Sequence, residues 1–576
     1  MEFTYRKNDN EALFKSVTSG DGMNVSDPQN YIPLYRRFFD LNNRNCDSIN
    51  LNNSSRLVTV DEKINENLFA CSIDQNNDLK EKHVFFKYSP LIDPIKYMMG
   101  KYDVNDPDLL ALPSFDNSKG HEKTIDENNA AYVDSFFTYL TSQMLNEHNF
   151  VHALDFYGSF LAKKNDFKFN IADDVEYLNE SDFFHEKRGS LFEVDNTFAN
   201  GVFNFNTRKN KERLVLEGDD VNVEVLELSD ISDLKELDSL FVDKPESATS
   251  DDSKPVDSLP DLLFTFDIKD KAEKDGKEKT NGDSDSECSS RSSVTSGEDD
   301  DEDEDEDEDD SSDGYSTASE DMLFATLPSF PVQVIALEKC EKTLDSLIMN
   351  DGEDMPDDEW GSMLIQVVMM LLAYQKSYQL THNDLHTNNI MYVTTDKPYL
   401  YYKYNSTYYK VPTFGRIFKI IDFGRAIYKF RGNVICSDSY HPKGDAATLY
   451  NFEPYFNEEK PRLEPNYSFD LCRLGCSILD FILDDLEDEP KHPRHAAKRI
   501  IRSWCIDDKG RNILYKKNGE ERYPNFKLYK MIARTVHNHT PENVIQNSYF
   551  DRFKSSKKKL SKSAKIMSID DLPSYV

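Results

Sequence analysis

Two short stretches in the second half of the chain decide its fold: THNDLHTNNI at residues 381–390 and IIDFG at residues 420–424. The first stretch contains Asp384 and Asn389, and the second contains Asp422. Carboxylate and amide oxygens are hard ligands of the kind that Mg²⁺ prefers in proteins. The two stretches therefore supply the residue types of a metal-assisted site.

The segments around these two stretches have clear periodicity. Apolar residues recur at helical spacing over residues 364–372, and acids near Asp357 favour the start of that helix. Residues 391–419, between the two stretches, alternate Tyr, Lys and Val and predict an extended hairpin, either a docking surface or a larger loop. Residues 470–483 predict another helix, with one apolar side made of Leu471, Leu474, Ile478, Phe481 and Ile482.

The order of these elements is more informative than any single motif. THNDLHTNNI fits the pattern H-x-D-L-x-x-x-N and IIDFG fits D-F-G, which are the two signatures of the protein-kinase catalytic centre. Each motif alone is a weak signal, because an Asp in a loop is usually a turn or a cap. Residues 467–475, YSFDLCRLG, also resemble the start of the central helix of the kinase C-lobe, where Asp470 would accept backbone amides of the catalytic loop.

The chain thus resembles the eukaryotic-type protein kinases, over residues 55–160 and 325–550. HNDLHTNNI and IIDFGRA resemble most the divergent serine/threonine-protein kinases of large nucleocytoplasmic DNA viruses. The resemblance implies an α+β, bilobal fold with a β-rich N-lobe and a mainly helical C-lobe. It also implies ATP and Mg²⁺ as cofactors and the Ser or Thr hydroxyls of a protein as substrate.

The resemblance gives each residue of the catalytic loop a role. Asp384 would orient the attacking hydroxyl and accept its proton, while Asn389 and Asp422 would hold the magnesium ions. His386 stands where serine/threonine kinases commonly have Lys. An imidazole with its ordinary pKa near about 6.5 would make phosphate binding there pH-sensitive. The alternative is a His that packs in the loop without a catalytic effect.

The residues that would bind the nucleotide lie further upstream. Residues 84–87, VFFK, resemble the V-A-I-K strand whose lysine, here Lys87, grips the phosphates. The alternative for Lys87 is a solvated lysine at the end of a strand. A helix predicted over residues 128–145 should supply a carboxylate to pair with this lysine, and Asp134 is the best candidate, although the family usually has Glu.

The adenine would be bound by a third segment. Residues 332–337 predict a buried strand, and Glu338 and Cys340 after it resemble the hinge whose backbone binds adenine. Two features depart from the family. No glycine occurs between residues 57 and 87, so the glycine-rich loop that covers the phosphates is missing. Asn383 replaces the catalytic-loop Arg that commonly clamps a phosphorylated activation loop, so we expect activity without that phosphorylation.

The acidic excess is concentrated in one segment. The net charge is −38, and residues 243–321 hold 30 acids and 8 bases, or 22 of the surplus negative charges. Few apolar residues oppose the charge repulsion there, which predicts disorder. We expect seven segments: an N-terminal extension (1–54), the first part of the N-lobe (55–160), a partly ordered insertion (161–242), an acidic disordered insertion (243–324), the N-lobe end and hinge (325–340), the C-lobe (341–552) and a basic tail (553–576).

The composition also limits partners and location. An acidic balance argues against a general nucleic-acid binder. The basic run at residues 557–565 is interpreted as a solvated tail rather than a contact with a polyanion or a membrane surface. The longest apolar run, residues 363–374, is too short to span a bilayer. The eight cysteines are scattered, as in a reducing compartment. We expect a cytoplasmic protein, in the host cytoplasm or the virion if it is viral.

Two other functions fit parts of the pattern. Small-molecule phosphotransferases of the aminoglycoside and choline type share the D-L-H-x-x-N form, but they more often follow the metal-binding Asp with residues other than Phe-Gly. A pseudokinase scaffold is suggested by the missing glycines. Scaffolds often lose a metal ligand, whereas Asp384, Asn389 and Asp422 are all present. The pattern therefore favours an active protein kinase.

Overall fold

The computed structural model describes residues 3–19, 22–194, 323–352, 355–482, 496–517, 519–560 and 564–576. This part of the chain is a mixed α+β structure, so the predicted fold class is confirmed at that level. The strand-like run predicted near residues 221–228 and the acidic insertion up to residue 322 lie outside the described residues.

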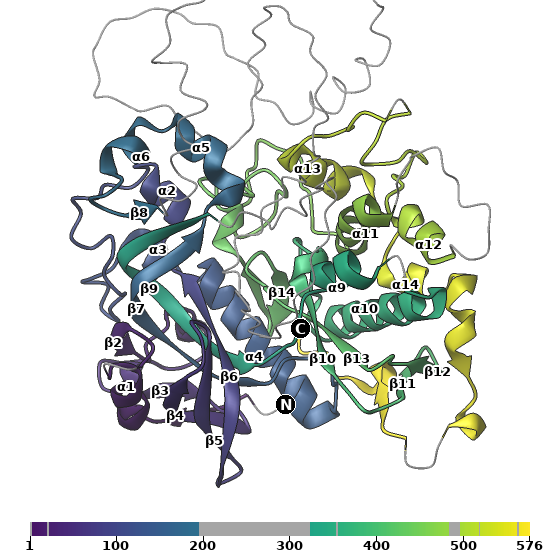
Figure 1. Cartoon of the computed structure of the whole chain (residues 1–576), viewed down its shortest axis with the longest axis horizontal. Coiled ribbons are helices and arrows are strands. Elements are labelled where there is room, and N and C mark those ends of the chain that lie inside the picture. The colour runs from purple at the N-terminus through teal and green to yellow at the C-terminus, as the bar shows by residue number, and fades with distance from the viewer. Residues whose placement is uncertain are drawn as a thin grey trace, which may run out of the picture.

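Seven antiparallel strands from residues 25–194 and 323–338 form one sheet (Figure 1). The residues up to 338 are called the first half below, and the residues after 338 the second half. The strand order of the sheet is β2-β7-β9-β6-β5-β4, and the short strand β8 pairs with β9. β9, drawn in teal, lies between the blue β7 and the purple β6, although residues 195–322 precede it in the chain. The strands are β2 (Val25–Gln29), β4 (Ser55–Lys63), β5 (Leu68–Gln75), β6 (Asp78–Pro90), β7 (Phe156–Asn170), β8 (Glu193–Val194) and β9 (Phe324–Glu338).

Alternation along β6 explains which of its side chains reaches a polar site. Val84, Phe86 and Tyr88 are buried, and the intervening Phe85 and Lys87 are only partly buried. Successive side chains of a strand point to opposite faces of the sheet, so the apolar residues fill the core on one face. Lys87 therefore projects from the other face, toward the second half of the chain.

The structure corrects two predicted boundaries of this region. β2 lies within the predicted N-terminal extension, yet it pairs with β7 and belongs to the sheet. The boundary at residue 160 cuts through β7, which is continuous from Phe156 to Asn170. β2 contains Ser, Asp, Pro and Gln, and the second part of β7 contains several Lys, Asn and Asp residues, so their polar composition hid their β-structure. The predicted strand at residues 150–160 begins only at Phe156.

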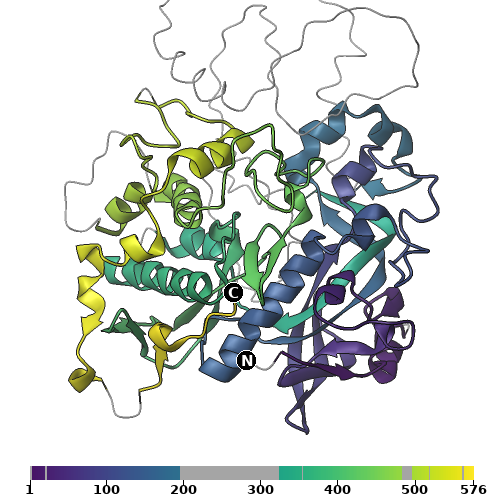
Figure 2. The ribbon, with the colours of Figure 1, turned by 180° about the vertical axis from the view of Figure 1, so that it is seen from behind.

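One long helix, α4 (Ala130–His148), lies between the sheet and the second half of the chain, as both Figure 1 and Figure 2 show. It confirms the helix predicted over residues 128–145. All side chains from Ala131 to Met144 are buried, so α4 is enclosed on every side. Tyr378 and Tyr428 from the second half donate their hydroxyls to the carbonyls of Leu140 and Val133, at 3.1 and 3.0 Å. These bonds fix α4 against the second half.

The second half is mainly helical and surrounds the buried helix α10 (Asp357–Tyr378), as predicted over residues 364–372. α11 (Phe469–Ile482) confirms the helix predicted at residues 470–483, but Phe481 is 40% exposed in its last turn and does not join the apolar side. The other helices are α9 (Leu344–Asp351), α12 (Ala496–Trp504), α13 (Phe526–Thr535) and α14 (Pro541–Val544).

The hairpin predicted over residues 391–419 is present and carries a second hairpin at its tip. Strands β10 (Ile390–Thr394) and β13 (Arg416–Ile420) pair antiparallel, and they enclose the hairpin of β11 (Tyr399–Tyr404) and β12 (Thr407–Pro412). β16 (Lys554–Ser555) and β17 (Ile566–Ser568) add strands at the two edges of the inner hairpin.

Strands β16 and β17 place described parts of residues 553–576 in the fold, which corrects their assignment to a separate basic tail. Lys557, Lys558 and Lys559 of the basic run are exposed, as expected. β17 pairs parallel with β11, and Met567 and Ile569 are buried. These apolar side chains follow the basic run, whose charge obscured them in the sequence. Among the described residues, no helix combines the length and the apolar character that crossing a bilayer requires.

Candidate active site

The polar loop after α10 is held by a buried carboxylate. Asp470, at the start of α11, accepts the backbone N–H groups of His382 and Asn383 at 2.9 and 2.8 Å. Asn383 has a φ of 64°, a left-handed conformation in which Asn is enriched among non-glycine residues. The support expected from Asp470 is confirmed. It fixes the backbone directly before Asp384.

Asn389 closes the same loop and leaves one atom available. Its Nδ2 donates to the carbonyl of Asp384 at 2.9 Å. Its Oδ1 is buried and has no hydrogen-bond partner among the described residues. The N–H of Ile421, the residue before Asp422, donates to the carbonyl of Asn389 at 3.0 Å, so the two segments are adjacent. Buried polar atoms are almost always paired, so an unpaired amide oxygen in this place suits a cation. The residues present thus fit a magnesium ion, with Asn389 and Asp422 as the protein ligands.

Three charged residues from three distant segments meet beside this loop. Lys87 Nζ lies 2.9 Å from Asp134 Oδ2 and 3.0 Å from Asp422 Oδ1. The predicted ion pair between Lys87 and Asp134 is therefore present, and Lys87 is not a solvated lysine. Asp134 Oδ1 also accepts the backbone N–H of Phe423 at 2.7 Å. One carboxylate on α4 thus links β6 to the D-F-G turn.

The electrostatics of this triad favour the charged forms of Lys87 and Asp422 but not that of Asp134. Burial alone would lower the pKa of Lys87, but the carboxylates of Asp134 and Asp422 outweigh burial and raise it. Burial and the neighbouring Asp422 raise the pKa of Asp134, although Lys87 opposes them. For Asp422, the attraction of Lys87 outweighs burial and lowers the pKa. Asp422 is therefore the more acidic carboxylate, as a metal ligand needs to be.

Phe423 fixes the D-F-G turn through aromatic contacts. Its ring lies 4.6 Å from the ring of Phe137 on α4 and 5.3 Å from that of His382 on the catalytic loop. Phe423 is buried. Edge-to-face contacts of this kind stabilise beyond the area they bury. The turn, the loop and α4 are consequently packed as one unit around the triad.

Asp384 is the candidate proton acceptor, and two further residues contact it. The Tyr529 hydroxyl, on α13, donates to Asp384 Oδ1 at 3.0 Å. Arg425 Nη1 lies 3.6 Å from the same oxygen, and Arg425 Nη2 contacts Asp445 at 3.0 Å. Both interactions converge on Oδ1, so Oδ2 remains for a substrate hydroxyl. Sequence reasoning missed Tyr529, because 145 positions separate it from Asp384 and no motif surrounds it.

His386 does not behave as an ordinary imidazole. Burial lowers its pKa to about 4, although Asp384 opposes this shift. The imidazole is therefore neutral near pH 7, and the charge change expected near pH 6.5 is wrong for this environment. Its Nε2 is buried with no hydrogen-bond partner among the described residues. His386 can offer one neutral hydrogen bond there, without a positive charge.

The expected hinge residues lie at the end of β9, beside β6. Glu338, at the end of β9, pairs with Lys419 at 2.7 Å, and its carboxylate also accepts the N–H of Asp155. Cys340 is partly buried, and burial raises the pKa of its thiol to about 12. Neither residue lines the cavity that contains Lys87 and Asp422. In the sheet, however, Glu338 pairs with Val84 on β6, three residues before Lys87, and the chain after it contacts the helical part through the N–H of Glu341 and the carbonyl of Tyr392 at 2.9 Å. The binding of adenine by the backbone at residues 338–340 stays a prediction.

The turn between β4 and β5 lies within residues 57–87, where the resemblance would place a glycine-rich loop. It lies next to Lys87, because the N–H of Phe86 donates to the carbonyl of Asn67 at 2.7 Å. Asn65 Oδ1 accepts the N–H groups of Asn67 and Leu68 at 3.0 and 2.8 Å. The backbone donors that a glycine-rich loop would offer to phosphates are thus already engaged by a side chain.

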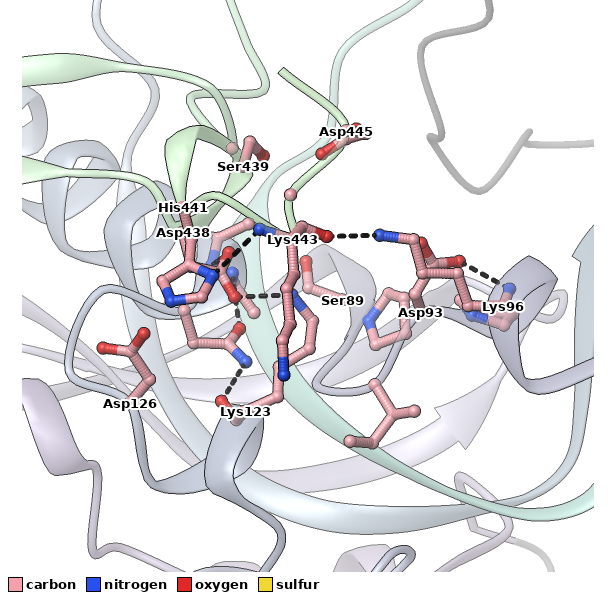
Figure 3. Close-up of a pocket in the computed structure, with 18 of the residues that line it drawn as sticks. Ser89, Asp93, Lys96, Lys123, Asp126, Asp438, Ser439, His441, Lys443 and Asp445 are labelled. Atoms are coloured by element: carbon pink, nitrogen blue, oxygen red, sulfur yellow. Dashed lines mark hydrogen bonds and ion pairs between the residues drawn. The ribbon is translucent and has the colours of Figure 1, made fainter. Parts of the chain in front are cut away.

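A cavity of about 1290 Å³ joins the triad to a second group of charged residues. Lys87, Asp134, Asp384 and Asp422 line one part of it. Figure 3 shows residues of the other part, where side chains of α2 (Pro94–Met98) and α3 (Glu122–Ile125) face residues 438–445. Neither a scan against protein-family models nor a search of curated proteins finds a match to this chain, so the geometry carries the assignment of function.

The described residues offer few other ligands for a metal ion. Among the residues that the structure describes, no three His, Cys, Asp or Glu side chains group as a metal site of their own. Mg²⁺ usually binds one or two carboxylates and completes its shell with water and substrate phosphates. A site with Asn389 and Asp422 as its protein ligands agrees with this coordination of Mg²⁺.

Proposed function

We propose that the chain is an ATP-dependent protein kinase that phosphorylates Ser or Thr hydroxyls, with the sheet as N-lobe and the helical half as C-lobe. One observation carries the proposal: Lys87 on β6, Asp134 on α4 and Asp422 in the D-F-G turn converge within 3.0 Å. An ion pair between a strand lysine and a helix carboxylate, next to the D-F-G aspartate, is the arrangement that phosphoryl transfer requires in kinases.

Each residue contributes positioning or charge. Asn389 and Asp422 would hold magnesium, which neutralises the charge of the phosphates when bound. Lys87 would contact the phosphates, at a point where two carboxylates already hold its ammonium group. Asp384 would direct its free Oδ2 at the substrate hydroxyl and accept the proton. Little covalent help is needed, because phosphoryl transfer depends mainly on positioning and electrostatic stabilisation.

One observation fits a small-molecule phosphotransferase, and another fits a scaffold without catalysis. The cavity is large, which suits a small alcohol bound beside a nucleotide as well as a protein side chain. The engaged amides of the β4–β5 turn favour a scaffold without catalysis. Against the scaffold stands the unpaired Oδ1 of Asn389, a metal-ligating atom that a scaffold does not need.

The test is magnesium-dependent transfer of labelled phosphate from ATP, measured on generic protein substrates and on a panel of small alcohols. The wild type should label protein Ser or Thr and leave the alcohols unlabelled, and Asp422→Ala should abolish the transfer. Labelling of an alcohol alone would favour the small-molecule phosphotransferase. Absence of any transfer by the wild type, or transfer that Asp422→Ala leaves unchanged, would sink the assignment.

A further inference from the structure

A carboxylate from the segment after the D-F-G turn lies at the beginning of α4. Asp438 opens a short 3₁₀ turn (Asp438–Tyr440), and only 6% of its surface is exposed. Its Oδ1 accepts the N–H of Ala130, the first residue of α4, at 3.0 Å. Its own N–H donates to the carbonyl of Asn128 at 2.7 Å. Asp438 thus joins the segment to the helix through both backbone and side chain.

The second oxygen of Asp438 pairs with a lysine. Lys123, on α3, donates its ammonium group to Asp438 Oδ2, and Figure 3 shows this contact. Burial would lower the pKa of Lys123, but Asp438 outweighs burial and raises it. A negative charge at a helix N-terminus is also favoured by the helix dipole. The Asp438 carboxylate therefore has two favourable partners: the backbone N–H of Ala130 at the start of α4 and the ammonium group of Lys123.

The contact between Asp438 and Ala130 lies one helical turn before Asp134 on α4. α4 begins at Ala130, and one turn later it carries Asp134, which holds Lys87 and the N–H of Phe423. Any shift of the first turn of α4 would move the Asp134 carboxylate away from these two partners. The lysine–carboxylate pair and the D-F-G aspartate must both be in place for transfer in kinases.

The residues beside Asp438 are not open to modification in this conformation. Ser437 and Ser439 are 0% and 7% exposed, and their hydroxyls are hydrogen-bonded to each other at 3.1 Å. In kinases that require it, activation-loop phosphorylation supplies new charge that orders the loop. Here a fixed carboxylate occupies a comparable contact between loop and helix, and Asn383 supplies no cation for a phosphate.

We propose that Asp438, paired with Lys123, is a positioning residue that clamps α4 in the place where Asp134 reaches Lys87 and Phe423, so that the site is assembled without phosphorylation. The clamp acts through α4 and does not touch the reacting groups. Its effect on catalysis rests on the proposed kinase function. Its effect on α4 does not, and the two can be measured separately.

The experiment uses the full chain and the variants Asp438→Asn, Lys123→Met, the double variant and Asp438→Glu. Asp438→Asn keeps an acceptor for the Ala130 N–H and removes the charge. Arg552→Met is the matched control, because it breaks an ion pair of similar exposure with Asp357, far from α4. Hydrogen exchange over residues 130–137, kcat and KM for MgATP, and phosphatase treatment are the readouts.

We expect at least tenfold faster exchange at the start of α4 in Asp438→Asn and in Lys123→Met, with no such change in Arg552→Met. KM for ATP should rise at least fivefold in both variants, the double variant should lose no more than the worse single variant, and Asp438→Glu should recover part of the loss. Phosphatase-treated wild type should keep its activity within about twofold.

Exchange at α4 that matches the wild type in both single variants would overturn the clamp, whatever the activity. Loss of wild-type activity after phosphatase treatment would overturn its role in place of phosphorylation. If the wild type transfers no phosphate, the kinase proposal falls while the exchange measurement still decides whether the clamp exists. If Asp438→Asn does not fold, Lys123→Met decides, since it leaves the carboxylate and its bond to Ala130.

Discussion

The catalytic loop and the sheet that faces it differ in how their polar groups are held. In the loop, residues 381–389 are supported by Asp470, and Asn389 keeps one oxygen unpaired. In the sheet, the β4–β5 turn uses its amides internally, and Lys87 pairs with Asp134 and Asp422. If the proposed function holds, this difference predicts that side chains and metal ligands, rather than a backbone loop, hold the phosphates of the nucleotide.

The largest effect should come from removing the only side chain that the sheet contributes to the triad. Lys87→Met should lower kcat/KM for ATP by about 100-fold or more, about 3 kcal/mol of transition-state stabilisation. It also leaves Asp134 and Asp422 without their shared cation. Lys163→Met is the matched control, because Lys163 lies in the same sheet and pairs with the exposed Asp27. Equal kinetics for the two variants would mean that backbone groups hold the phosphates after all.

The next effect concerns a histidine between α4 and β7 that bonds the hairpin of residues 391–419. His152 bonds the carbonyl of Phe418 at 2.7 Å and the hydroxyl of Tyr402 at 2.6 Å, and burial lowers its pKa to about 4. The unfolded chain takes up the proton near about pH 6.5, so the folded state loses stability as the pH falls from about 6.5 to 4. The expected loss of unfolding free energy is roughly 2 to 3 kcal/mol.

Urea unfolding of the wild type and of His152→Gln, measured between pH 7 and pH 4, checks this prediction. Both proteins share the titration of His386, so the difference between them isolates His152. The wild type should lose more stability over this range than the variant. Identical pH dependence would show that His152 does not contribute.

A smaller effect is expected on the loop side. Tyr529→Phe removes the hydroxyl that holds Asp384 Oδ1, so kcat should fall about tenfold, or about 1.4 kcal/mol, while KM for ATP stays unchanged. Tyr549→Phe is the control, since its hydroxyl bonds the Asp357 carbonyl away from the site. A rise in KM for ATP with constant kcat would place Tyr529 in nucleotide binding instead.

The smallest effect should come from the turn itself. Asn65→Ala releases the N–H groups of Asn67 and Leu68, but the turn is not expected to contact phosphate, so KM for ATP should change by less than about threefold. The measurement is KM for ATP, compared between Asn65→Ala and the wild type. A tenfold change in either direction would show that these amides do take part, and the contrast between the two regions would disappear.

The two regions also differ in what the sequence could reveal. Asp384, Asn389 and Asp422 lie within forty residues, in motifs whose spacing reflects their chemistry, and Asp470 followed from a third motif. The pairing of Lys87 with Asp134 was predictable because β6 and α4 are each strongly patterned. Tyr529 and Asp438 were not, since each depends on a contact between distant segments that leaves no local periodicity.

The same reasoning explains the structural errors. β2 and the second part of β7 are polar strands that form only because β9 and β7 offer them partners, so their alternation is weak. Residues 566–569 were hidden by the charge of the run before them. The pKa of His386 depends on burial by the whole loop, which no motif encodes.

The most direct measurement is transfer of labelled phosphate from MgATP to protein substrate by the wild type beside Asp384→Asn. The variant keeps the size of the side chain and can still accept a hydrogen bond from Tyr529, but it has no carboxylate to accept the proton. We predict transfer by the wild type and a rate at least 100-fold lower in Asp384→Asn. Equal rates for the two proteins, or no transfer by the wild type, would contradict the assignment of the catalytic centre.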